Sequence, residues 1–145
     1  MQLMKVCRTI TVCLLALLTV SAWAGTDANS LYQQAQARFA DQHYQAAVEL
    51  MQKAVKLEPD NSDFQHLLGK CYGRLAEQSN PISAISLSQK TRKALEKAVQ
   101  LDNHNISALR DLMEYYRQAP GFLGGSKTKA NKIEKRLQDF GVSTG

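Results

Sequence analysis

The sequence predicts an all-α fold built from repeated helical hairpins. Two nine-residue stretches, 53–61 (KAVKLEPDN) and 97–105 (KAVQLDNHN), resemble each other at an offset of 44 residues. Apolar residues recur at spacings of three and four, and no alternating pattern is long enough to predict a strand. Self-similarity at a fixed offset is typical of repeat architectures, in which each unit buries its apolar face against its neighbours.

Residues 1–24 have the features of a signal peptide. Lys5 and Arg8 precede an apolar run from Ile10 to Val20, and Ala22-Trp23-Ala24 provides small residues at the positions that a signal peptidase reads. We expect cleavage before Gly25 and a periplasmic location, with secretion beyond the cell also open. An uncleaved anchor is the alternative, although the run is short for crossing a bilayer and no transmembrane segment is expected after it.

Residues 25–145 form the expected domain. The formal net charge of +5 includes Lys5 and Arg8, so it falls to +3 without the signal peptide. This ordinary value gives no reason to expect a nucleic-acid partner. Cys7 and Cys13 also leave, and Cys71 then has no partner for an internal disulfide. We expect a buried thiol that packs as a small apolar side chain.

The first predicted pair of helices occupies residues 29–57. Asn29 or Ser30 is a suitable N-cap for a helix that continues to about Ala40. A second helix is expected from Tyr44 to Leu57, because Pro59 cannot continue the helical hydrogen-bond ladder.

Two further pairs follow. One begins with Asn61 or Ser62 as the N-cap, is interrupted at 79–81 (SNP) and ends near Leu101 with a longer second helix. The third begins after Asn105 and has a glycine-rich loop at 120–125. Its last helix is expected to start at Ser126 and to stop at Gly141.

This punctuation resembles the tetratricopeptide repeat, a helix–turn–helix unit of 34 residues. The matching residues are Ala35, Phe39, Tyr44, Ala47, Ala54 and Pro59 in the first unit, Leu68, Gly69 and Tyr72 in the second, and Leu109, Leu112 and Tyr116 in the third. The units cover about 28–61, 62–105 with some ten extra residues between its helices, and 106–140. The resemblance implies a right-handed α-solenoid of about three hairpins. Residues 119–127 also resemble small exported bacterial proteins of this type, for which the likeness implies no established activity.

The resemblance also implies a binding groove lined by the first helix of each hairpin. Carried over by position, five residues of each unit face the groove: Asn29, Tyr32, Gln36, Phe39 and Ala40 in the first, Asp63, His66, Lys70, Gly73 and Arg74 in the second, and Ser107, Arg110, Glu114, Arg117 and Gln118 in the third. Eight of these are the predicted site residues: Tyr32, Gln36, Phe39, His66, Lys70, Arg74, Arg110 and Arg117. The aromatic residues would supply apolar contacts, and the Lys and Arg residues would pair with carboxylates of an acidic peptide or partner helix. The alternative is that these residues belong to ordinary solvated faces.

No arrangement of residues predicts catalysis. His43, His66 and His104 lie far apart without metal-ligand spacing. The loop at 121–128 ends in Lys-Thr like a phosphate-binding loop, but Ser126 stands where that motif has the glycine before its lysine. We therefore expect no enzyme activity, no cofactor and no metal.

Two features near the C-terminus have alternative interpretations. Phe122 and Leu123 are expected to pack between the second and third hairpins, or else to form a lid over a ligand. The last helix is rich in lysine, which fits a solvated capping helix or an anionic partner such as membrane headgroups.

These observations predict a non-catalytic protein–protein interaction module of the bacterial envelope that binds a peptide or a partner's helix in the groove. The alternative function is a structural subunit that stacks on itself or on a larger repeat protein.

Overall fold

The computed structural model describes residues 27–143, and every regular element in this range is helical. The all-α prediction is confirmed, whereas the predicted signal peptide at 1–24 lies outside the described residues. The elements in order are α1 (Ala28–Ala40), α2 (Tyr44–Leu57), α3 (Ser62–Glu77), α4 (Pro81–Leu101), α5 (Ile106–Gln118), the 3-10 helix η1 (Gly121–Leu123) and α6 (Lys127–Asp139). Within 27–143, no helix has the length and apolar character needed to cross a membrane.

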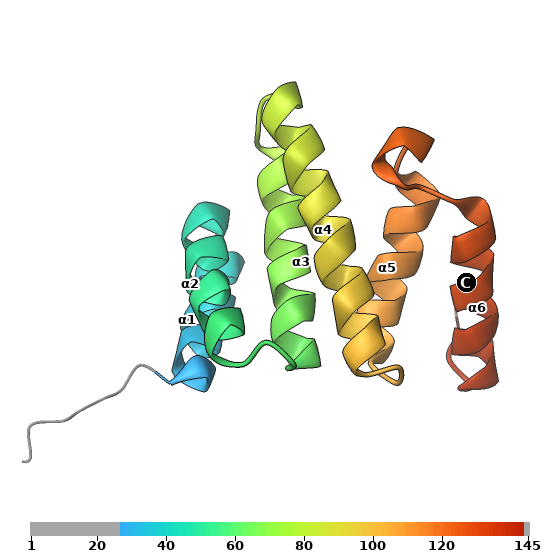
Figure 1. The fold of residues 1–145 in the computed structure, drawn as a ribbon, viewed down its shortest axis with the longest axis horizontal. Coiled ribbons are helices and arrows are strands. Elements are labelled where there is room, and N and C mark those ends of the chain that lie inside the picture. The colour runs from blue at the N-terminus through green and yellow to red at the C-terminus, as the bar shows by residue number, and fades with distance from the viewer. Residues whose placement is uncertain (1–26, 144–145) are drawn as a thin grey trace, which may run out of the picture.

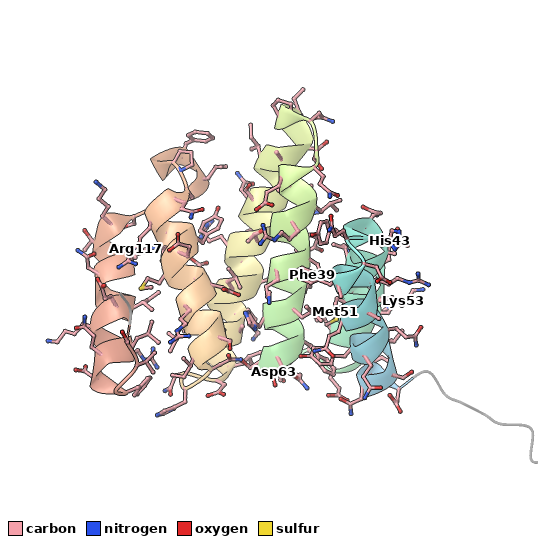
Figure 2. The ribbon with its side chains drawn as sticks, turned by 180° about the vertical axis from the view of Figure 1, so that it is seen from behind. Phe39, His43, Met51, Lys53, Asp63 and Arg117 are labelled. Atoms are coloured by element: carbon pink, nitrogen blue, oxygen red, sulfur yellow. The ribbon has the colours of Figure 1, made fainter. Side chains whose placement is uncertain are left out.

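The helices form one row in which each packs against the next along the chain (Figure 1). α3 also contacts both α1 and α5, whereas α2 does not contact α4 and α4 does not contact α6. The side of the row formed by α1, α3 and α5 is therefore the inner one. Figure 2 shows this side, with α3 in front of α4 and α1 in front of α2.

Side-chain caps begin most of the helices at the predicted places, and Asn80, which the sequence analysis treated as part of an interruption, is a further cap. Asn61, Asn80, Asn105 and Ser126 each accept a backbone N–H from the first turn of the following helix. The prediction was wrong for α1, because Asp27 is its cap and accepts from the Ser30 N–H. A carboxylate at this position also interacts favourably with the positive end of the helix dipole.

The last helix ends at a left-handed glycine, as predicted. Gly141 has φ +74°, a conformation that costs a residue with a Cβ about 1 kcal/mol. The N–H of Gly141 bonds to the carbonyl of Gln138, and the Val142 N–H bonds to that of Leu137. This pair of bonds is the Schellman arrangement, which satisfies carbonyls that the helix leaves without partners.

The core has two apolar clusters, one among α1, α2 and α3 and the other among α4, α5 and α6. Their largest fully buried side chains are Met51 and Cys71 in the first, and Leu109 and Leu137 in the second. The clusters meet where α3 packs on α4: a Cβ built on Gly69 would lie only 2.9 Å from Cδ2 of Leu95. Gly69 therefore permits the close approach that joins the two halves.

The extra residues of the second unit lengthen its helices. The sequence interpretation placed about ten residues between the helices, but α3 and α4 are separated only by the turn at 78–80. α4 has 21 residues against 14 in α2, a difference of about 10 Å at 1.5 Å per residue. Asn80 caps α4 and Pro81 is at its start, where proline is favoured. The α3–α4 hairpin consequently projects beyond its neighbours (Figure 1).

Polar contacts join the beginnings of α3 and α5. The side-chain amide of Asn105 donates to Ser62 Oγ at 2.9 Å and to Asp63 Oδ1 at 3.0 Å. Ser62 Oγ in turn donates to the Ala98 carbonyl at 2.9 Å. Because Asn105 also caps α5, one side chain starts this helix and fixes it to α3.

Candidate functional site

A cleft of about 290 Å³ opens on the inner side of the row, between α3 and α5 and beside the end of α1. Residues with small or apolar side chains contribute to its lining from α3 and α4: Gly69, Gly73, Thr91 and Leu95. A Cβ on Gly73 would lie 3.6 Å from Cγ2 of Thr91, so any larger side chain here would partly fill the cleft.

The two walls of the cleft differ in charge. The α3 wall carries Lys70, Arg74 and Glu77, and the α5 wall carries Asp111 and Glu114. At the α1 end, Lys70 Nζ is 5.3 Å from the centroid of the Phe39 ring, within range of a cation–π interaction. The cleft therefore has one wall of mixed charge, one acidic wall and the aromatic ring of Phe39 at its edge.

Two ion pairs involve the charged residues of the cleft. Arg74 Nη1 donates to both carboxylate oxygens of Glu77, at 2.9 and 3.2 Å. This hydrogen bonding, with the charge of Glu77, raises the pKa of the Arg74 guanidinium. Since both side chains are more than half exposed, the pair adds little to stability. His66 Nε2 lies 2.6 Å from Asp111 Oδ2 and joins α3 to α5, with only 12% of the His66 side chain exposed.

The structure brings three of the eight predicted site residues, Phe39, Lys70 and Arg74, to the cleft. His66 lies beside the cleft, where its ring contacts the lining residue Asp111. Tyr32 stacks on Phe64 with ring centroids 5.1 Å apart.

The remaining three predicted residues are directed elsewhere. Gln36 is exposed on α1. Arg110 Nη2 is 3.4 Å from the Ser143 carbonyl, and Arg117 Nη2 pairs with Glu134 of α6 at 2.8 Å (Figure 2). The predicted site for an acidic peptide thus lacks two of its four cations, Arg110 and Arg117. The face of α5 that lines the cleft carries residues 111, 114, 115 and 118 instead.

Sequence reasoning did not identify the acidic residues of the site as partners of its cations. It placed Glu114 and Gln118 on this face but missed Glu77, Asp111 and Tyr115. The signal that indicates Glu77 is its spacing of three from Arg74, which makes the two side chains neighbours on a helix. Asp111 has no such local signal, since its partner is 45 residues away in the chain.

A second cleft, of about 310 Å³, lies between the projecting end of the α3–α4 hairpin and the loop after α5. Its lining is mostly small or apolar and includes Ala76, Ala84, Ala119, Pro120 and Leu123. The expectation that Phe122 packs inward was wrong, because this side chain is 74% exposed. The 3-10 turn directs Leu123 inward instead, and Tyr115 Oη donates to the Leu123 carbonyl at 2.9 Å.

The projecting end of the hairpin carries no charged residue and exposes two isoleucines. Residues 78–89 contain no Asp, Glu, Lys or Arg, in a chain with 21% charged residues. Within this segment Ile82 is 84% exposed and Ile85 is 44% exposed. The absence of charged residues is a property that this surface shares with the centres of protein interfaces, and its two exposed isoleucines would lose contact with water in such an interface.

Burial raises the pKa of two side chains in the core, Cys71 and Tyr116. Burial raises the pKa of the Cys71 thiol to about 12, which keeps it neutral and unreactive at ordinary pH. Burial and a hydrogen bond to Glu96 also raise the pKa of Tyr116. Glu96 accepts from Tyr116 Oη at 2.6 Å and from Arg92 Nη1 at 3.1 Å. Among residues 27–143, no His, Cys, Asp and Glu side chains form a group suited to a metal ion.

Comparison with known proteins gives one match. A family model described as alkyl sulfatase dimerisation matches residues 16–97, more than half of the chain, and this range includes α1, α2, α3 and most of α4. No curated protein matches the chain. The chain belongs to the alkyl sulfatase dimerisation family.

Proposed function

We propose that this protein is a non-catalytic protein-association module that pairs with a second copy of itself. The observation that carries the proposal is the uncharged, projecting end of the α3–α4 hairpin with its exposed Ile82 and Ile85. The family to which the chain belongs is named for dimerisation, and the matched range includes this end.

Self-association would remove both isoleucines from water. Fully burying an aliphatic side chain stabilises an assembly by about 1.5–3 kcal/mol. The neighbouring cleft, with its small and apolar lining, offers the same surface of a second copy a place to pack. In a two-fold dimer each copy would contribute both the projecting end and the cleft, so the contact would form twice.

Analytical ultracentrifugation over a concentration series tests the proposal. The wild-type protein is expected to dimerise, and the double variant Ile82→Ser/Ile85→Ser is expected to remain monomeric with unchanged helical circular dichroism. Leu57→Ser is the matched control, because Leu57 is also an exposed aliphatic residue at 57% but lies at the far end of α2. A monomeric wild-type protein, or equal loss of dimer in both variants, contradicts the proposal.

The mixed-charge cleft favours a second function, the binding of a peptide or a partner's helix on the inner side of the row. Lys70 and Arg74 on one wall would pair with acidic groups of the ligand, and Asp111 and Glu114 on the other with basic groups. The ligand that fits is therefore a segment with both signs of charge rather than a purely acidic one. Peptide arrays scored against Lys70→Glu/Arg74→Glu test this function, since the selected peptides should change their acidic positions.

The framework of both functions would be a short right-handed solenoid of tetratricopeptide type. Consecutive helix packing and the contacts of α3 with both α1 and α5 support this proposal. We further propose that the module works in the periplasm after removal of residues 1–24, as the composition of that segment predicts. N-terminal sequencing of the protein isolated from a periplasmic extract tests the export, with Gly25 as the expected first residue.

A further inference from the structure

The net positive charge of the described part of the chain resides in α6. This helix carries four lysines, one arginine and two acids, a net charge of +3. The other residues between 27 and 143 carry eleven basic and eleven acidic side chains, which cancel. The domain is therefore electrically asymmetric, with its excess charge on one terminal helix.

Lys132 and Lys135 lie on the side of α6 opposite its buried residues, and Lys127 and Lys129 lie on its flanks. Its inward side packs on α5 through Ala130 and Leu137, both fully buried. Lys127, Lys129, Lys132 and Lys135 are all exposed. Because α6 is the last helix of the row, its outward side faces away from the rest of the described structure (Figure 2).

Two charged side chains of α6, Glu134 and Arg136, make contacts inside the structure. Glu134 is directed toward α5, where it pairs with Arg117 at 2.8 Å, so its carboxylate does not neutralise the outward lysines. The guanidinium of Arg136 is also used internally and donates to the Asn103 carbonyl at 2.7 Å. The exposed side of α6 therefore carries Lys127, Lys132 and Lys135 together with one acid, Asp139, whereas Lys129 Nζ lies over the Tyr116 ring of α5 at 5.1 Å.

The placement of two of these lysines is unfavourable for the isolated helix. Lys127 and Lys129 lie in the first turn, which contains no acidic residue. Cations at a helix N-terminus oppose the dipole and cost about 0.3–1 kcal/mol each. A function that requires positive charge on this surface accounts for an arrangement that helix stability does not favour.

We propose that the outward side of α6 binds the surface of an anionic lipid bilayer by electrostatic attraction. Lysine ammonium groups are mobile point charges, which suit a fluid layer of headgroups, and the outward side of α6 lacks the arginine forks that favour bidentate phosphate recognition. Neither of the two clefts described above is lined by α6, so the surface does not enclose a peptide. The outward lysines form a simple convex surface suited to a flat membrane.

The test measures binding of the full chain to lipid vesicles by co-sedimentation. Vesicles of phosphatidylcholine with about one third phosphatidylglycerol are compared with phosphatidylcholine alone, at low and high salt. Each lysine near an anionic surface contributes roughly a five-fold change in affinity, so Lys132→Gln/Lys135→Gln, which removes two charges, is expected to weaken binding to the anionic vesicles by about 30-fold. Lys132→Glu/Lys135→Glu, which changes the charge by four, is expected to give a larger loss in the same direction.

Lys53→Glu/Lys56→Glu is the matched control, because these two exposed lysines have the same spacing but lie on α2 at the other end of the row. Residues 1–24 are identical in all variants, and the neutral vesicles measure any binding through them. Equal loss in both lysine pairs, binding unaffected by salt, or capture of duplex DNA or an acidic peptide in preference to anionic vesicles overturns the proposal. Because the dimer surface proposed above does not include α6, sedimentation of the variants distinguishes failure of one proposal from failure of the other.

Discussion

Leu109→Ala is expected to destabilise the whole helical row. Leu109 is fully buried in the cluster among α4, α5 and α6. The substitution removes three carbon atoms, which at about 0.8 kcal/mol each lose roughly 2.4 kcal/mol of transfer free energy. The incompletely closed cavity adds to this loss, so the expected decrease in the free energy of unfolding is about 3–4 kcal/mol. For a domain of this size the melting temperature should fall by roughly 10 °C or more.

Circular dichroism at 222 nm during urea and thermal unfolding measures this decrease. Leu57→Ala is the control and should cost less than about 0.5 kcal/mol, since Leu57 is 57% exposed. The close packing of Gly69 on Leu95 joins the two clusters, so Leu109→Ala should shift a single transition. Two separate transitions, with only the C-terminal one shifted, would show that the clusters unfold independently and that the reasoning about the α3–α4 junction is wrong.

Three further predictions concern the loop, the thiol and the buried polar group. Gly125→Ala should lower the free energy of unfolding, measured in urea, by at least about 2 kcal/mol, because its Cβ would lie 1.7 Å from the Ala119 carbonyl oxygen and the loop would have to move. Gly121→Ala is the control and should be nearly neutral, since no other atom lies within 4 Å of the added Cβ. Since the pKa of Cys71 is raised from 9.0 to about 12 in the folded protein, its contribution to stability is complete below pH 9 and is lost as the pH rises toward 12. Urea unfolding at several pH values should show this decline in the wild type and a shallower one in Cys71→Ala. Tyr116→Phe removes the hydrogen bond to the Glu96 carboxylate and should lower the free energy of unfolding by about 1.5–3 kcal/mol. Tyr115→Phe should lower it by only about 1 kcal/mol, because the acceptor of Tyr115 is the uncharged Leu123 carbonyl. Equal losses in the two variants would contradict the greater strength of the bond to the carboxylate.

Most helix boundaries could be predicted because they depend on local chemistry. Asn61, Asn105 and Ser126 cap helices at the expected places, and Gly141 ends the last one. The cap of α1 could not be chosen in this way, because residues 27, 29 and 30 are all suitable types and their order alone does not decide among them. The carboxylate of Asp27 occupies the position, and α1 starts earlier than predicted.

The longer second unit shows where the pattern of a repeat misleads. Comparison with a 34-residue unit treats extra residues as an insertion between helices, whereas Asn80 and Pro81 begin a helix that continues without interruption to Leu101. The sequence did indicate a longer second helix, and Asn80 and Pro81 are the local signals for its start.

The cleft was less predictable than the fold. Phe39 and Lys70 could be placed near it by position along their helices. The roles of Arg110 and Arg117 could not, since they depend on contacts with Ser143 and Glu134 in the last part of the chain. Electrostatic partners distant in sequence decide which charges a ligand meets, and no local pattern records them.

The contacts of Asn105 have a mechanical consequence for the inner cleft. Asn105 and the nearby His66–Asp111 pair hold α3 and α5 together in their first halves, whereas the Arg74 guanidinium near the other end of the cleft pairs with Glu77 of its own helix. Relative movement of the two walls should therefore be a rotation about the fixed end, so that the width of the opening varies most beside Glu77 and Gln118. A bound segment that thickens in this direction would wedge the helices apart without breaking the hydrogen bonds at the pivot.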